Sequence, residues 1–277
     1  EISCSLVGSE MCIRDRYMRK REDFVPMKTL ECRGITLSDK QTKICVPITG
    51  TDLEEIKEQA EKIANMNPDV VEWRADFYDV KDNDETEFEQ CLKAINDNLK
   101  KIPIIYTYRT SNEGGEKSID VDDYCRLCKY VSEISEKYNV AMIDVELYEN
   151  KDRKDIGKLL LDIKSTGVKV IGSNHHFEGT PSEKDIFNVL KTMEEAGADI
   201  CKIAVMPKEK VDVKTLINAS KKANKELNAP IITMSMGELG AVTRICTRMT
   251  GSVVTFGAGV NAVSYTHLRA HETAANL

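Results

Sequence analysis

The strongest constraint on the fold is a regular alternation, between residues 43 and 256, of short apolar runs and longer amphipathic stretches. The apolar runs occupy residues 43–49, 69–74, 103–109, 141–146, 168–173, 199–204, 229–235 and 252–256. Most of them are rich in Val and Ile without polar alternation, which is typical of parallel strands that are covered on both faces. We therefore predict eight parallel strands separated by helices.

The stretches between these runs carry signals for the start and the end of helices. Residues 51–54 and 180–183 both fit a capping box, and Pro181 suits the first helical position. Gly167 and Gly197 stand where C-terminal caps belong, just before the next apolar run. We therefore expect helices with one apolar face between the strands.

Eight strands joined by helical crossovers fit an α/β fold, the closed (β/α)8 or TIM barrel of about 250 residues. An open doubly wound sheet is the alternative. That fold usually carries a Gly-rich turn after its first strand, which residues 47–51 (Pro-Ile-Thr-Gly-Thr) lack. No internal linker interrupts the alternation, so one barrel domain is expected.

The charge balance limits the partners of this chain. With 39 Lys and Arg against 46 Asp and Glu, the net charge is -7, which disfavours nucleic acid. No apolar stretch reaches the length of a membrane helix, and the N-terminus lacks the pattern of a secretory signal.

Nine irregularly spaced cysteines indicate reduced thiols in the cytoplasm. The close pair Cys125 and Cys128 lies on an apolar stripe, which favours core packing over metal binding.

Polar side chains recur at the carboxyl ends of the predicted strands, the face where barrel enzymes build their active sites. Glu72, Arg74, Arg109, Asp144, Glu146 and Ser235 stand at such ends, His175 follows the fifth strand, and Lys202 lies within the sixth. Lys202 is the sharpest of these signals because it interrupts an apolar strand. Burial disfavours the charged ammonium, so we expect a free amine that can attack a carbonyl carbon. A structural ion pair with Asp199 or Glu146 is the alternative.

The histidines and arginines of this face suggest further roles. His175 and His176 follow the fifth predicted strand, and only one can face the mouth, where it would act as a general base. Glu72 is expected to orient that histidine, or else to pair with an arginine. Arg109 and Arg244 suggest the capture of a small anion through forked hydrogen bonds, with a solvated arginine as the alternative.

Six segments, taken in order, resemble type I 3-dehydroquinate dehydratases over about residues 27–262. They are residues 71–76 (VEWRAD), 108–115 (YRTSNEGG), 173–177 (SNHHF), 201–207 (CKIAVMP), 235–244 (SMG through TR) and 255–257 (TFG). The resemblance implies a barrel enzyme that dehydrates 3-dehydroquinate to 3-dehydroshikimate in the shikimate pathway of aromatic amino acid biosynthesis. It also implies a homodimer that needs no metal or other cofactor.

By motif position, the resemblance implies a role for each polar residue of the mouth. Lys202 would form a Schiff base with the substrate, His175 rather than His176 would transfer protons, and Glu72 would assist the histidine. The implied substrate contacts are Arg74, Arg109, Glu113, Arg244 and Phe256, with Arg244 on the substrate carboxylate. The iminium would acidify the adjacent carbon, so that His175 can remove its proton and return it to the departing hydroxyl.

Both flanks depart from the family pattern. Residues 1–26 match nothing in it, and the pattern breaks after residue 262, where a substrate-contact loop and a final helix are expected. We interpret 27–262 as a barrel domain that lacks its last helix, and 1–26 and 263–277 as non-native extensions. Loss of about four large apolar side chains would cost about 6 to 12 kcal/mol, which rivals the stability of a typical domain.

Two other functions stay open at this point. One is a Schiff-base aldolase acting on a phosphorylated sugar, which a phosphate at Arg244 would favour. The other is a truncated, non-catalytic barrel that only binds a carboxylate. No metal site is expected, since His267 and His271 have no third ligand in sight.

Overall fold

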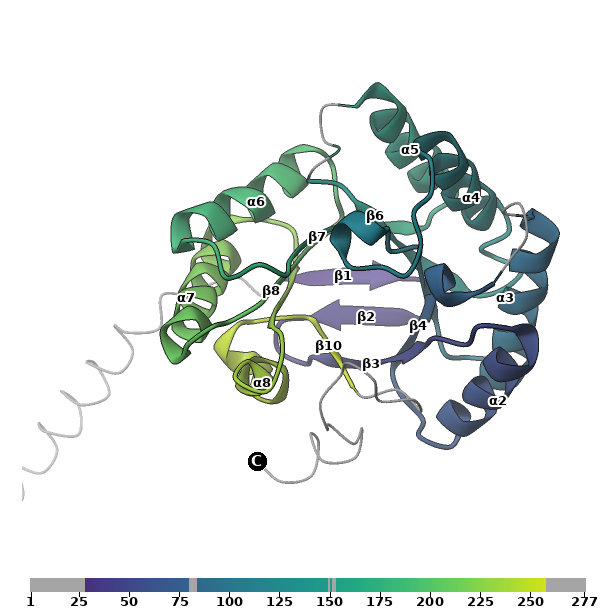
Figure 1. Ribbon diagram of the computed structural model, residues 1–277, viewed down its shortest axis with the longest axis horizontal. Coiled ribbons are helices and arrows are strands. Elements are labelled where there is room, and N and C mark those ends of the chain that lie inside the picture. The colour runs from purple at the N-terminus through teal and green to yellow at the C-terminus, as the bar shows by residue number, and fades with distance from the viewer. Residues whose placement is uncertain (1–27, 80–83, 149, 151–152, 258–277) are drawn as a thin grey trace, which may run out of the picture.

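The structure is a computed structural model that describes residues 28–79, 84–148, 150 and 153–257 (Figure 1). The strands are β1 (Thr29–Cys32), β2 (Ile35–Ser38), β3 (Lys43–Ile48), β4 (Val70–Arg74), β5 (Ile104–Thr107), β6 (Val140–Glu146), β7 (Lys169–His176), β8 (Ile200–Val205), β9 (Ile231–Ser235) and β10 (Val254–Phe256). The helices are α2 (Leu53–Ala64), α3 (Glu85–Leu99), α4 (Val121–Glu133), α5 (Lys154–Ser165), α6 (Glu183–Glu195), α7 (Lys210–Glu226) and α8 (Ala241–Ile245). Three short 3-10 turns are η1 (Ala75–Phe77), η2 (Ser111–Glu113) and η3 (Thr247–Met249).

Strands β3 to β10 form one parallel sheet in the order β10-β3-β4-β5-β6-β7-β8-β9, with the helices outside it (Figure 1). This arrangement confirms the predicted (β/α)8 TIM barrel, and each predicted apolar run overlaps one strand. One boundary was wrong in a way that matters for the site. Strand β7 continues to His176, so both histidines lie within the strand rather than after it.

The barrel is nearly closed, because in the described part of the chain β9 and β10 share no strand ladder. The backbone N–H of Val253 still donates to the carbonyl of Ile231 at 3.0 Å. The hydroxyl of Ser252 accepts from Thr233 N at 2.9 Å and donates to Thr233 O at 3.0 Å. A serine side chain therefore takes the place of the missing ladder bonds at this seam.

The helix ends follow the predicted chemistry with small shifts. Asp52 caps α2 and Ser182 caps α6, each accepting a backbone N–H three residues on. The predicted capping boxes thus begin one and two residues too early, because Asp and Ser at these positions are equally good caps. Gly167 (φ 83°) and Gly197 (φ 101°) adopt the left-handed conformation that ends a helix, as predicted.

The crossover between β9 and β10 is short. Between β9 and β10 the chain forms only the five-residue helix α8 and the turn η3. Part of this segment is apolar and exposed, including Leu239, Val242 and Ile245. The predicted loss of the final helix concerns residues after 257, which lie outside the described residues. The predicted non-native extensions, residues 1–26 and 263–277, also lie outside them.

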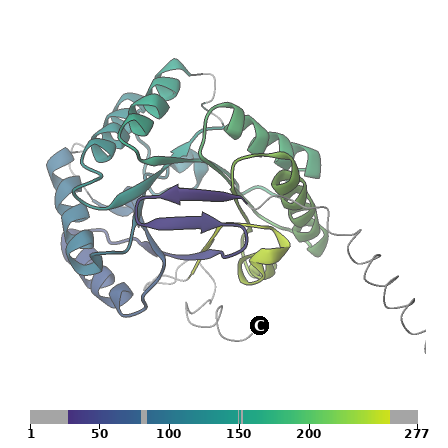
Figure 2. The ribbon, with the colours of Figure 1, turned by 180° about the vertical axis from the view of Figure 1, so that it is seen from behind.

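A hairpin of β1 and β2, which the sequence pattern did not reveal, precedes the barrel. Seen from behind in Figure 2, it lies across the end of the barrel opposite the polar strand ends. Leu37 of β2 is fully buried and packs with barrel residues such as Cys45 and Val70. The hairpin therefore closes the floor of the barrel.

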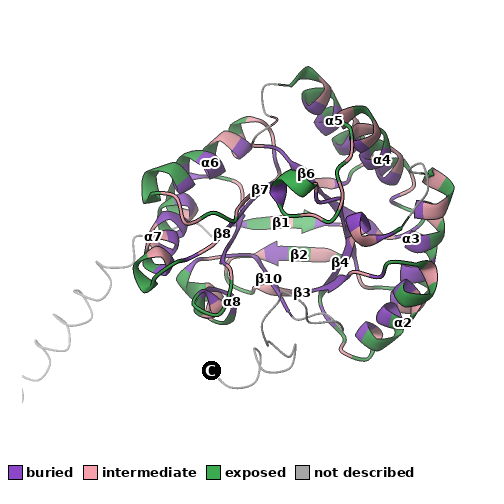
Figure 3. Ribbon diagram, viewed as in Figure 1, coloured by how far each residue is buried: buried purple, intermediate pink, exposed green. Residues whose placement is uncertain are grey.

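The apolar residues form two cores, one inside the barrel and one between the strands and the helices. The inner core contains Ile105, Ile171 and Ile200 beside the floor hairpin, and the outer core contains residues such as Trp73 and Phe88. Figure 3 shows the buried side of the helices facing the sheet. Among the described residues, no helix has the length and apolar character that crossing a bilayer requires.

Candidate active site

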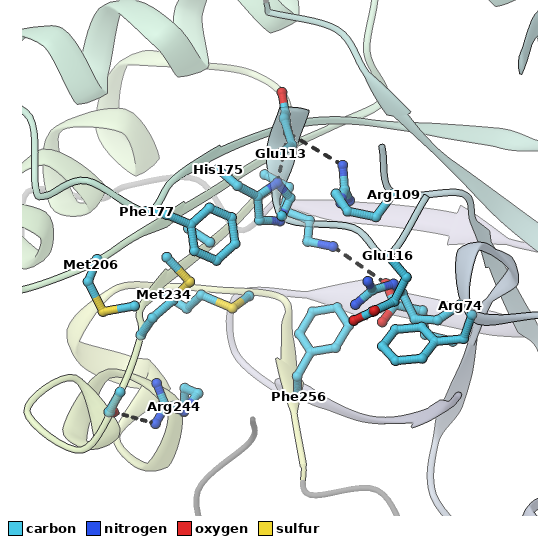
Figure 4. A pocket seen from close by; sticks show the side chains of 17 residues that line it. Arg74, Arg109, Glu113, Glu116, His175, Phe177, Met206, Met234, Arg244 and Phe256 are labelled. Atoms are coloured by element: carbon cyan, nitrogen blue, oxygen red, sulfur yellow. Dashed lines mark hydrogen bonds and ion pairs between the residues drawn. The ribbon is translucent and has the colours of Figure 1, made fainter. Parts of the chain in front are cut away.

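A cavity of about 350 Å³ opens at the carboxyl ends of the barrel strands (Figure 4). All eight site residues that the sequence predicts line it: Glu72, Arg74, Arg109, Glu113, His175, Lys202, Arg244 and Phe256. Apolar side chains, including Met206, Met234 and Phe177, form another part of the wall. The volume lies in the range of small-molecule sites.

Strand register brings these residues together. Side chains alternate along a strand, so Ile200, Lys202 and Ala204 of β8 share the inward face. The ladder between β7 and β8 pairs Ser173 with Lys202 and His175 with Ala204. His175 and Lys202 therefore lie diagonally on the same inward face of adjacent strands.

Lys202 is buried, with only 4% of its surface exposed. Its Nζ donates to Asp144 at 2.8 Å and lies 3.6 Å from Glu72. The Nζ also lies 4.7 Å from the ring centroid of Phe256. Burial disfavours the ammonium, but Asp144 and Glu72 outweigh it and raise the pKa of Lys202. The expected free amine is therefore wrong, because two carboxylates hold the proton on the lysine.

His175 is held by Glu113 rather than by Glu72. Its Nδ1 lies 2.8 Å from Glu113 Oε2, and Phe177 stacks on its ring at 6.4 Å between centroids. Burial and the cations Arg109 and Lys202 lower the pKa of His175 well below its usual value, so the imidazole is neutral. The expectation that Glu72 orients the histidine is thus corrected, since Glu72 instead accepts from Thr107 at 2.9 Å.

Arg109 lies inside a cluster of carboxylates. Its guanidinium donates to Asp144 at 2.8 Å, to Glu146 at 3.2 Å and to Glu113 at 3.4 Å. Despite burial, these three partners raise its pKa. The structure therefore differs from the expectation of anion capture, because carboxylates of the protein already occupy this guanidinium.

The pKa values of the two acids beside Arg109 are shifted in opposite directions. Burial raises the pKa of Glu113 to about 8, against the pull of Arg109. Burial also opposes the ionisation of Asp144, but Arg109 and Lys202 hold the pKa of Asp144 well below its usual range. Two neighbouring carboxyl groups thus have very different affinities for a proton.

The remaining two arginines are held in different ways. Arg244 is buried, and it donates to the backbone carbonyls of Ser235 and, at 2.8 Å, of Gly237. Arg74 forms a forked pair with Asp76, with donor to acceptor distances of 2.8 and 2.7 Å. Both guanidinium groups border the cavity.

Sequence reasoning missed several residues of this site. It noted Asp144 without a role, and it gave none to Asp76 or to the cavity wall of Met234 and Met236. The alternation of Ile232 and Met234 in β9 with Met236 just after it indicated that wall in the sequence. The ion pairs had no such signal, because they join residues from different strands. Among the described residues no group of three or more His, Cys, Asp or Glu side chains is arranged to hold a metal ion.

Known proteins match this chain along most of its length. The family model described as type I 3-dehydroquinase matches residues 44–274. The chain belongs to the type I 3-dehydroquinase family. The 3-dehydroquinate dehydratase of Clostridium novyi is 37% identical over 247 residues, which are 89% of this chain and 95% of that protein. The enzyme of the same name from Bacillus licheniformis is 41% identical over 238 residues, 85% of this chain and 91% of that protein.

Solved structures of the family agree with the fold. The 3-dehydroquinate dehydratase of Geobacillus kaustophilus superimposes with a TM-score of 0.81 at 30% identity, covering 88% of this chain and 93% of that one. The type I enzyme of Clostridium difficile has a TM-score of 0.78 at 36% identity, covering 83% of this chain and 89% of that one. Membership of the 3-dehydroquinase family confirms the predicted family and the predicted class of enzyme, a hydro-lyase.

Proposed function

We propose that this 3-dehydroquinase converts 3-dehydroquinate to 3-dehydroshikimate in the shikimate pathway, through a Schiff base on Lys202 and proton transfer by His175. The observation that carries the proposal is the β7–β8 register, in which these two side chains share the inward face beside one cavity. The family membership of the chain supports the substrate.

The first step makes the nucleophile. Lys202 is an ammonium because its pKa is raised, so it must lose a proton before its nitrogen can attack. Neutral His175 has a free ring nitrogen for that proton, and the transfer is uphill because the pKa of His175 is lowered while that of Lys202 is raised. The free amine then adds to the ketone carbon, and the resulting hydroxyl takes the proton from His175 and leaves as water. The product is an iminium between Lys202 and the substrate.

The second step eliminates the hydroxyl. His175 removes a proton from the carbon beside the iminium, and the electron pair of the broken C–H bond moves toward the iminium nitrogen. The same proton passes to the substrate hydroxyl, which leaves as water while the electrons return to form a conjugated iminium. Hydrolysis consumes one water and frees Lys202. The net change is the loss of one water from the substrate.

We assign the arginines different roles in substrate binding. Arg244 donates to neutral carbonyl oxygens, whereas Arg109 donates to carboxylates. The motif position of Arg244 and its place in the cavity wall support it as the group that meets the substrate carboxylate through a forked pair. Arg109 instead holds Asp144 and Glu113 in place, and Arg74 and Phe256 complete the substrate contacts at the cavity wall.

The structure of the Clostridium difficile relative is described with covalently modified comenic acid. We take this acid as support for a covalent step at the corresponding cavity of this chain. Lys202 is the buried amine of that cavity, and the two carboxylates beside it would stabilise the positive charge of an iminium.

The test combines product detection with trapping. We expect 3-dehydroquinate to give the ultraviolet absorption of a conjugated enone, and borohydride in the presence of substrate to leave a reduced adduct on Lys202, found by mass spectrometry. Lys202→Ala should abolish both signals. The matched control is Lys28→Ala, since Lys28 is a second buried lysine, bonded to Ala223 O at 3.2 Å, whose pKa burial lowers.

The outcomes separate the alternatives. An adduct on Lys202 without enone would indicate a site that binds the ketone but does not eliminate water. An adduct that still forms in Lys202→Ala would show that another residue is the nucleophile. Enone formed by Lys202→Ala at the wild-type rate would rule out the Schiff-base route.

A further inference from the structure

A buried carboxylate lies just behind the cavity wall. Asp76 follows β4 in the turn η1 and is 0% exposed. Its Oδ1 accepts from Arg74 Nε at 2.8 Å and from Arg109 N at 3.3 Å. Its Oδ2 accepts from Arg74 Nη2 at 2.7 Å and from Glu116 N at 3.2 Å. Four donors converge on one carboxylate, which compensates the cost of burying its charge.

Two of these donors belong to Arg74. The forked pair fixes the plane of the guanidinium, because both bonds use one edge of it. The ring of Phe77 lies 4.9 Å from the guanidinium carbon. Arg74 is therefore clamped from two sides, while the same side chain borders the cavity.

The other two donors lie at the ends of a loop, residues 109–116. Within this loop Gly115 N donates to Thr110 O at 2.8 Å, which makes a tight turn. The loop carries Glu113, whose carboxyl group contacts His175 Nδ1 at 2.8 Å. The backbone N–H groups of residues 109 and 116 thus bind to Asp76. These two bonds hold in place the segment that orients the histidine.

We propose that Asp76 is a positioning residue that sets the direction of Arg74 toward the substrate and holds loop 109–116 against His175. The proposal deepens the proposed function and rests on it, because part of its readout is the turnover of 3-dehydroquinate. Asp76 itself does not border the cavity, so it acts through the groups that it holds.

The first test is Asp76→Asn, which keeps the shape of the side chain. Each oxygen of Asp76 accepts two N–H groups, so an amide NH2 must face N–H donors whichever way it turns. We expect KM to rise by about tenfold, the size expected for the loss of one hydrogen bond to a charged group. In an Arg74→Ala background the same substitution should no longer raise KM, because the two residues act as a unit.

The chain offers a matched control. Arg153 and Asp155 have the same spacing and a forked pair at 2.7 Å, but at a surface position at the start of α5. Asp155→Asn should leave KM and kcat unchanged. An additive effect of Asp76→Asn and Arg74→Ala on KM would point to a merely structural role and would overturn the proposal.

Hydrogen exchange tests the loop without any substrate. We expect the amides of Arg109 and Glu116 to exchange at least about tenfold faster in Asp76→Asn, while amides in β6 keep their rates. Unchanged exchange at these two amides would contradict the proposal even if KM rises. Faster exchange in a protein whose wild type does not turn over 3-dehydroquinate would instead refute the proposed function alone. If Asp76→Asn does not fold, Asp76→Glu, which keeps the charge, replaces it in the same measurements.

Discussion

The protonation state of each side chain in the cavity is set by its neighbours rather than by its residue type. Lys202 keeps its proton because two carboxylates outweigh its burial. His175 loses its proton because burial is joined by two cations. Glu113, with a pKa of about 8, can switch its charge in the range where enzymes work. A change at one position of this cluster therefore alters the proton affinity of the others.

Glu113→Gln should remove a pH dependence of turnover near pH 8. When Glu113 is protonated it donates to Nδ1 of His175, and the other ring nitrogen then carries the proton. When Glu113 is ionised it accepts from Nδ1, which leaves the other nitrogen free to act as a base. In the wild type, kcat should therefore rise as pH passes through about 8. The measurement is kcat against pH, with the exposed Glu133→Gln as control, and a step that persists in Glu113→Gln would contradict the assignment.

The same pKa has a consequence for stability with a definite sign. Burial raises the pKa of Glu113 from 4.5 to about 8, so the folded state binds a proton more tightly than the unfolded state. The contribution of this group is complete below pH 4.5 and is lost as pH rises through about 8. Relative to Glu113→Gln, the wild type should lose free energy of unfolding across this window, as denaturant titrations at several pH values would show.

At the scale of elements, strand register converts distant sequence positions into one site. A shift of one residue between β7 and β8 would move either His175 or Lys202 to the outer face, because side chains alternate along a strand. In the described part of the chain, β9 and β10 are the neighbouring barrel strands that share no ladder. There the hydroxyl of Ser252 replaces ladder bonds to Thr233.

Ser252→Ala should therefore destabilise the barrel by about 1–3 kcal/mol, because it leaves a buried N–H and a buried C=O of Thr233 without their partner. The measurement is the free energy of unfolding from chemical denaturation. Ser165→Ala is the control, since Ser165 also donates to a backbone carbonyl, that of Asp162, but is exposed. Its cost should stay within about 0.5 kcal/mol. Equal losses in both variants would refute the role of the seam.

In the whole molecule, the residues that we expect to stabilise the fold and those that line the active site lie at opposite ends of the barrel. The hairpin of β1 and β2 closes the floor with apolar side chains, and the mouth carries the charged cluster. Between them lies a layer of aliphatic side chains, including Ile105, Ile171 and Ile200. This layer lies between the floor and the cavity, so we expect changes at the floor to act on folding rather than on the chemistry.

Leu37→Ala tests that separation. Leu37 is fully buried, so its truncation should lower the free energy of unfolding by about 2–5 kcal/mol. The kcat/KM of the folded fraction should not change, because the floor lies at the opposite end of the barrel from the mouth. Leu161→Ala, at a leucine that is 72% exposed, should be neutral within about 0.5 kcal/mol. A large loss of kcat/KM in Leu37→Ala would show that the two ends are coupled.

The sequence by itself determined the barrel, its strand order and eight of the residues that line its mouth. Local apolar runs, helix caps and alternation depend on neighbouring positions. Glu72, His175 and Lys202 stood in or just after predicted strands, which a parallel barrel gathers around one mouth. It did not reveal the floor hairpin, whose two four-residue strands are too short to show a pattern. Only the tertiary structure decided which carboxylate pairs with which cation. Those partners come from different strands, and burial and Coulomb attraction depend on distances through space, so Glu113 rather than Glu72 meets His175 and Lys202 stays charged.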